Sequence, residues 1–189
     1  MLLKIYNLLL KEYKAQNWWP VTSQNAQFEI IIGAILTQNT TWKNVEPTIK
    51  KLKDNNLLNK ENILKVEEQK LANLIRSSGY FKQKARKLKE IAKFNKKASR
   101  ENLLQVWGVG KETADSILLY AYNQPYFVVD AYTKRIFNRI GFKEKTYEQF
   151  QEMFHAKLPK YTGLYKEYHA LIVRHAKETC KTKPLCNKG

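Results

Sequence analysis

The chain has 189 residues, of which 43% are hydrophobic, so it can bury a core and is not a disordered protein. There are 34 Lys and Arg against 17 Asp and Glu, and the net charge of +17 indicates a polyanionic partner, either nucleic acid or an acidic membrane surface. Seven glycines and five prolines argue against a turn-rich β-sandwich or barrel, and the apolar run 30–36 is too short to span a bilayer.

Apolar residues recur at helical spacing along almost the whole chain. The first apolar stripe covers 2–15, and Pro20 then breaks the helical pattern, because proline disfavours helix in the residue before it. Further helices are predicted at 25–37, from after Thr41 to about Lys53, and at 60–65, 67–76, 82–94, 100–105, 111–122, 131–140, 146–157 and 163–179. Only the short run 126–129 has the residue types of a strand, so the predicted fold class is all-α.

Two glycines, Gly108 and Gly110, flank one apolar residue between two predicted helices. Glycine permits a tight turn and lets the backbone approach a ligand closely. The second helix would begin at Lys111, so its free N–H groups would face the turn and could bind a phosphate. Lys111 would add a charge and Thr113 a hydroxyl. This is a candidate helix-hairpin-helix motif, although a glycine pair also occurs in ordinary interhelical turns.

Asp130 follows the apolar run 126–129 and directly precedes a predicted helix. A carboxylate at this place is a good N-cap, and this structural role alone would explain an aspartate at position 130. A carboxylate some 20 residues beyond a phosphate-binding hairpin also suggests a second interpretation. The hairpin would bind a nucleic-acid backbone while Asp130 acts on a sugar.

The sequence Gly108-Val-Gly-Lys-Glu-Thr-Ala-Asp115, together with Val128-Val-Asp130, resembles the helix-hairpin-helix-Gly/Pro/Asp DNA glycosylases, in particular the endonuclease III-like branch. Three further stretches agree in the same order along the chain, namely 33–40, 75–85 and 168–177. One departure is Trp107, where the family's hairpin usually has proline.

The resemblance implies two helical lobes with a DNA-binding cleft between them. Residues 21–129 would form a helical barrel lobe with the hairpin, and 1–20 with 130–189 the second lobe. The amides of Val109 and Lys111 would hold a phosphate, and Gln38 would fill the space left by an extruded base. The resemblance also implies a Na⁺ or K⁺ ion on hairpin carbonyls, here those of Leu104, Val106 and Val109.

Bifunctional relatives carry a lysine two residues after the second hairpin glycine, and this chain has Glu112 there. Lys111 is one residue earlier and projects about 100° away on a helix, so it is better placed for phosphate than for a sugar. The sequence therefore predicts a glycosylase without lyase activity. Asp130 would stabilise an oxocarbenium-like sugar and orient or deprotonate water.

The segment Trp18-Trp19-Pro20 resembles the base-pocket segment of endonuclease III-like 3-methyladenine glycosylases, with Trp42 as a further pocket residue. Each tryptophan could equally be a core anchor. Alkylated purines such as 3-methyladenine and 7-methylguanine are cationic and suit an indole face. The predicted substrate is double-stranded DNA with such a base, which is flipped out of the stack. A glycosylase for oxidised or mispaired pyrimidines is the main alternative.

Cys180 and Cys186 are the only cysteines, whereas the [4Fe–4S] cluster of most endonuclease III relatives needs four. They are a remnant, or further ligands lie beyond Gly189. We expect two free thiols and no cluster, rather than a zinc site with His169 or His175. Without a recognisable signal peptide, the chain is expected to be a cytoplasmic, nucleoid-associated monomer.

Two other classes of protein remain as alternatives. A non-catalytic helix-hairpin-helix module would bind DNA but would need neither Asp130 nor the paired tryptophans. A protein that binds acidic membranes would need a basic amphipathic helix with an isolated apolar face, which the sequence lacks.

Overall fold

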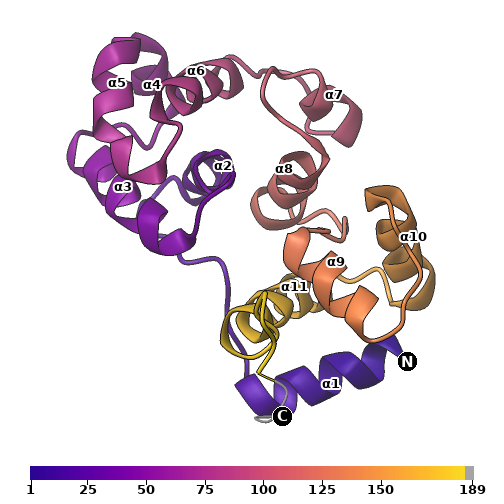
Figure 1. Cartoon of the computed structure of the whole chain (residues 1–189). Helices are drawn as coiled ribbons and strands as arrows, with labels where there is room; N and C mark the ends of the chain where they lie inside the picture. The colour runs from indigo at the N-terminus through magenta and orange to yellow at the C-terminus, as the bar shows by residue number, and fades with distance from the viewer. Residues whose placement is uncertain (186–189) are drawn as a thin grey trace. The chain divides into compact units, whose positions relative to one another are not determined.

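A computed structural model describes residues 1–185, and within this range the chain is helical and contains no β-strand (Figure 1). The contacts divide the chain into two compact units. One unit is Val21–Tyr122, and the other combines Met1–Pro20 with the chain from Asn123 onward. The boundary falls at residue 122, whereas the predicted lobes were separated after residue 129. None of the helices in the described range is long and apolar enough to cross a membrane.

The unit Val21–Tyr122 is built around one buried helix, α2 (Ala26–Leu36), in which every residue from Phe28 to Leu36 is buried. Asn25 caps this helix, because its side chain accepts a hydrogen bond from the Phe28 amide. The other elements of the unit are α3 (Trp42–Asp54), α4 (Lys60–Lys65), α5 (Glu68–Leu74), the 3-10 helix η1 (Arg76–Ser78), α6 (Phe81–Ala92), α7 (Arg100–Leu104), α8 (Lys111–Ser116) and the π-helix η2 (Ile117–Ala121). Because α3, α6, α8 and η2 all contact α2, the hairpin formed by α7 and α8 is attached to the core of this unit.

The second unit contains α1 (Leu2–Tyr13), α9 (Ala131–Arg139), α10 (Tyr147–Lys157) and α11 (Thr162–Glu178). Helix α11 contacts both α1 and α9. The core is aromatic, because Phe127 stacks on Phe154 at 3.7 Å between ring centroids, and Phe137 and Tyr168 meet Phe154 edge to face. This packing buries the extended segment that leads to Asp130.

Two predicted segments, one helical and one strand-like, differ from the structure in a way that concerns the candidate site. The helix predicted over 111–122 is α-helical only to Ser116 and continues as the wider η2, whose residues are all buried. The run 126–129 is not part of a sheet, and side chains of α10 bind its backbone instead.

Candidate active site

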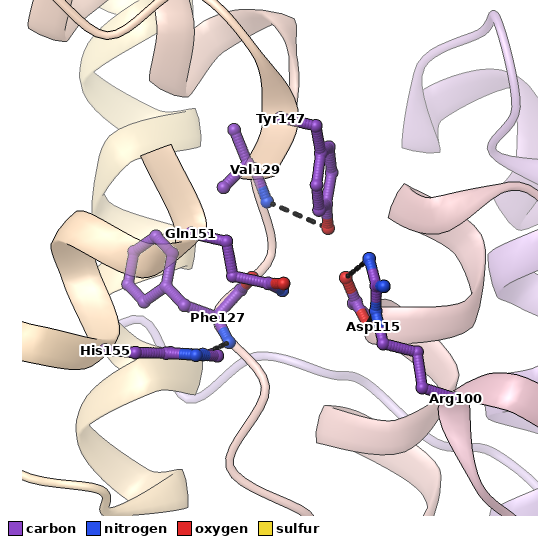
Figure 2. A network of polar contacts seen from close by, with 7 residues as sticks. All are labelled: Arg100, Asp115, Phe127, Val129, Tyr147, Gln151 and His155. Atoms are coloured by element: carbon purple, nitrogen blue, oxygen red, sulfur yellow. Dashed lines mark hydrogen bonds and ion pairs between the residues drawn. The ribbon is translucent and has the colours of Figure 1, made fainter. Parts of the chain in front are cut away.

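The hairpin lies between α7 and α8, and an ion pair joins these two helices. Arg100 Nε donates to Asp115 Oδ1 at 2.7 Å, and a second guanidinium nitrogen donates to Oδ2 at 3.2 Å (Figure 2). The Asp115 side chain is fully buried, so the bidentate contact neutralises a charge that has little access to water. The pair therefore fixes the two helices that carry the glycine turn.

The two hairpin glycines have different backbone conformations. Gly108 has φ +84°, in the region that favours glycine, whereas Gly110 has φ −93° and serves as the N-cap residue of α8. A Cβ on Gly108 would lie 2.5 Å from Lys87 Cγ, but a Cβ on Gly110 would meet nothing within 4 Å. Only Gly108 needs to be glycine for the fold, so a requirement for glycine at position 110 would have to come from a ligand. Val109, between them, is buried, and its amide donates to the Val106 carbonyl at 3.0 Å.

Gln38, at the end of α2, is bound to the hairpin on both sides of the turn. Its Nε2 donates to the Gly108 carbonyl at 3.0 Å and to Thr113 Oγ1 at 2.9 Å. Lys87 Nζ donates to the other end of the amide, Gln38 Oε1, at 2.6 Å. Burial lowers the pKa of Lys87. Gln38, predicted to fill the space of an extruded base, holds the hairpin in this conformation and would have to leave these partners to enter a duplex.

Asp130 caps α9 in the second unit and is held in the ionised form. Its Oδ1 accepts from the Thr133 amide at 2.7 Å and from Thr133 Oγ1 at 2.8 Å. His169 Nε2 lies 3.6 Å from Oδ2, and each of these two side chains is only 13% exposed. Burial alone would raise the pKa of Asp130, but His169 and the two bonds from Thr133 together bring it below its usual value. The result is a carboxylate that stays charged although it is largely removed from water.

The segment before Asp130 is anchored by three side chains of α10, as Figure 2 shows. Gln151 Nε2 donates to the Phe127 carbonyl at 2.8 Å, and the Phe127 amide donates to His155 Nε2 at 2.9 Å. The Val129 amide donates to Tyr147 Oη at 3.5 Å. Because His155 accepts through Nε2, this nitrogen carries no proton. These bonds set the backbone from which the Asp130 carboxylate projects.

The predicted pocket residues lie in two places in the chain's fold. Trp18 and Trp19 are adjacent and half-buried, with ring centroids 5.3 Å apart and planes tilted by 45°, and Pro20 after them is exposed. These three residues belong to the unit that contains Asp130. Trp42 is the first residue of α3 in the other unit and is also half-buried. The two tryptophans of the segment 18–20 thus form an aromatic pair.

Residues 32–160 match the family described as HhH-GPD superfamily base excision DNA repair protein. The chain belongs to this superfamily. It is 48% identical to a candidate DNA repair glycosylase of Methanocaldococcus jannaschii, over 99% of this chain and 92% of the relative. It is 32% identical to endonuclease III of Thermotoga maritima, over 85% of this chain and 78% of that protein. The structure of an H. pylori 3-methyladenine DNA glycosylase bound to 1,N6-ethenoadenine has 28% identity and a TM-score of 0.84, covering 94% of this chain and 97% of that one.

Membership in the HhH-GPD superfamily confirms the sequence-based assignment of a DNA glycosylase of the endonuclease III type, which acts in base excision repair. The all-α fold is confirmed as well. DNA is accordingly the macromolecular partner of this enzyme.

Several contacts of this glycosylase were not predicted from its sequence. Thr133 could have been, because it stands three residues after Asp130, where a cap donates its amide. His169 beside Asp130 and Lys87 beside Gln38 have no such local signal, since they are 39 and 49 residues away from their partners. Only the tertiary fold brings these side chains together.

Within residues 1–189, Cys180 and Cys186 alone cannot supply the four thiolates of a [4Fe–4S] cluster. Cys180 is buried, its Sγ accepts from Arg139 at 3.1 Å, and its carbonyl accepts from Arg135 at 2.9 Å. In residues 1–185, no three His, Cys, Asp or Glu side chains are grouped so that they could hold a metal ion. Cys186, considered as a zinc ligand from the sequence, lies outside the described residues.

Proposed function

We propose that this DNA glycosylase is monofunctional and excises alkylated purines, with 3-methyladenine as the main substrate and 7-methylguanine as a further candidate. The observation that carries this proposal is the ionised, largely buried Asp130 carboxylate in a chain whose hairpin has Glu112 in place of the lyase lysine. The paired indoles of Trp18 and Trp19 and the similarity to the H. pylori 3-methyladenine glycosylase support the choice of base.

In the proposed reaction, the damaged nucleotide is flipped out and its N-glycosidic bond breaks, so that positive charge develops on the deoxyribose ring. Asp130 opposes this charge electrostatically, and water then adds to C1′ while one of its protons leaves to solvent or to the carboxylate. A carboxylate whose pKa is lowered is a weak base but a persistent anion. Charge stabilisation and orientation of water are therefore its main contributions, with deprotonation of the water as a minor one.

The chemistry of the base supports this small set of groups. Alkylation at N3 or N7 gives the purine a positive charge and weakens its bond to the sugar, so the enzyme needs little acid catalysis of departure. An electron-rich indole attracts such a cation through its face as well as by stacking. Trp18, Trp19, Pro20 and Trp42 are the residues that we propose for recognition of the base.

The hairpin would hold DNA without reading its sequence. The amide and ammonium of Lys111 and the close approach that Gly110 permits are suited to a phosphate, whereas the Val109 amide would have to leave the Val106 carbonyl to bind one. Gln38 and Thr113 would also contact the DNA. A Na⁺ or K⁺ ion on the carbonyls of Leu104, Val106 and Val109 would add positive charge behind the turn.

Chromatography of the bases released from methylated duplex DNA tests the proposal. We expect 3-methyladenine in the eluate with the native protein and none with Asp130→Asn, which keeps a good helix cap and hence the fold. If the protein releases no base from methylated DNA but releases thymine glycol or uracil from duplexes that contain these bases, it acts on pyrimidines and the substrate assignment is wrong. If it binds duplex DNA equally well with either residue but releases no base from any damaged duplex, it is a non-catalytic module.

Borohydride trapping on DNA with an abasic site tests the absence of lyase activity separately. The native protein should form no covalent adduct, and an efficient adduct would refute this part of the proposal. Glu112→Lys restores the lysine of bifunctional relatives at its position, so this variant should gain a trapped adduct and serves as the positive control.

A further inference from the structure

Trp107, the residue directly before Gly108, is an exposed aromatic side chain at the turn of the hairpin. It is 46% exposed, whereas Val109, two residues further along the turn, is buried. The Arg86 guanidinium lies over its ring, with Cζ 4.3 Å from the centroid. This distance is that of a close cation–π contact. An indole that remains accessible to solvent is therefore held in place by a cation.

Helix α6 supports the hairpin through two consecutive residues. Arg86 lies against Trp107, and Lys87 packs its aliphatic chain where a Cβ of Gly108 would be, with its ammonium on Gln38. The turn is therefore held by side chains of α6, which lie outside the motif. The indole is not needed to close the turn, since Gly108 provides its φ of +84° and the Val109 amide closes it on the Val106 carbonyl.

The surface around Trp107 combines an apolar ring with positive charge. Arg86 and Lys111 are exposed, and Lys87 is half-buried beside them. A protein partner with an apolar groove would have to desolvate the guanidinium that lies on the ring, which is costly. A DNA backbone offers both complementary parts, because the C–H face of deoxyribose is apolar and the next phosphate is anionic.

We propose that Trp107 and Arg86 form a second contact with the DNA backbone, in which the indole packs on a deoxyribose and the guanidinium binds the adjoining phosphate. The proposal rests on the proposed binding of DNA by the hairpin and extends it to a pair of side chains on its outer surface. The contact does not depend on base sequence or on damage. It adds an apolar component to a binding energy that is otherwise mainly electrostatic.

Binding to an undamaged duplex at several salt concentrations tests this proposal independently of the damaged base. Trp107→Ala should weaken binding about five- to tenfold, the low end of the range for aromatic stacking on nucleic acids, because a sugar offers less surface than a base. The salt slope should stay unchanged, because this contact releases no counterion. Arg86→Met should reduce the slope by about 0.9, the value for one phosphate contact with B-DNA. Trp107→Phe should retain most of the affinity. Leu64→Ala, which shortens a 39% exposed side chain of α4 in the same unit, is the matched control and should change neither quantity.

Trp107→Pro separates contact with DNA from a role in turn rigidity. If Trp107 only stiffens the turn, the proline variant retains the native affinity and the proposal is wrong. We expect the proline variant to bind DNA as weakly as Trp107→Ala.

Labelling with 5-fluorotryptophan gives a second measurement. The ¹⁹F resonance that Trp107→Phe removes should shift on addition of duplex, and an unchanged resonance at saturation would contradict the contact. Lys111→Met reports on the hairpin itself, so unchanged binding in this variant points to failure of the proposed hairpin function rather than of the Trp107 contact.

Discussion

Replacement of Thr133 by valine tests whether hydrogen bonds from Thr133 stabilise the charge of the Asp130 carboxylate. Valine has nearly the shape of threonine but lacks the hydroxyl that donates to Asp130 Oδ1 at 2.8 Å. The Thr133 amide, which donates to the same oxygen at 2.7 Å, and the contact with His169 both remain. Thr133 is fully buried, so water does not replace the missing donor.

The size of the effect follows from the lost bond. A hydrogen bond to a charged group contributes about 1.5 kcal/mol, and this corresponds to a rise of about one unit in the pKa of Asp130. Because the pKa of Asp130 in the folded protein lies below its ordinary value of 3.8, the carboxylate stabilises the native protein above that pH. This stabilisation is lost as the pH falls through the folded pKa. Thr133→Val should therefore be less stable by about 1.5 kcal/mol at pH 7.

Urea denaturation between pH 7 and pH 3 measures this difference, with Thr133→Ser as the control that retains the hydroxyl. The difference between the valine variant and the native protein should shrink as Asp130 becomes protonated, and the serine variant should stay close to the native protein. The acidic limb of the base-release rate should also move to higher pH in the valine variant. A stability difference that grows toward pH 3 would contradict this role of the hydroxyl, because the lost bond would then not be one to a charged carboxylate.

Three further predictions concern the unit that carries the hairpin. Gly108→Ala should lower the free energy of unfolding by about 1–2 kcal/mol because of its positive φ, whereas Gly110→Ala, with ordinary φ and open space, should leave thermal stability within a degree or so. Arg100→Met should destabilise by about 3 kcal/mol because it removes the ion-pair partner of buried Asp115, and addition of Asp115→Asn should recover much of this loss in the same denaturation assay. Burial, and secondarily Lys87, lowers the pKa of Lys84 from 10.5 to about 8. Between pH 8 and pH 10.5 Lys84 is therefore protonated in the unfolded state but not in the folded state. The stability of the native protein relative to Lys84→Met should rise with pH in this window, by at most about 3 kcal/mol. A relative stability that falls across this window would contradict the assignment.

The helices were predictable because local signals determine them. Asp130 marks a helix start in the sequence, and its side chain accepts the expected amide bond in the structure. Asn25 is a residue of the same type, and it caps α2 at the start of the helix predicted over 25–37. The exception is the helix predicted over 111–122, whose second half is the π-helix η2. Local periodicity does not distinguish an α-turn from a π-turn among residues that are all buried.

The candidate site was predictable only in part. The hairpin and Asp130 stand in recognisable local contexts, so their positions could be inferred before any contact was known. The state of the Asp130 carboxylate depends on His169, and the conformation of Gln38 depends on Lys87, both of which come from distant segments. Contacts of this kind depend on helix packing, and a single sequence carries no direct record of it.

We propose that Asp130 supports hydrolytic release of an alkylated purine from DNA. Its most direct test is a single-turnover experiment with duplexes that each contain one defined lesion, either 3-methyladenine, uracil or thymine glycol. We expect release of 3-methyladenine well above the uncatalysed rate, loss of this release in Asp130→Asn, and little release of either pyrimidine. Equal release of 3-methyladenine by both proteins, or release of the pyrimidines alone, would contradict it.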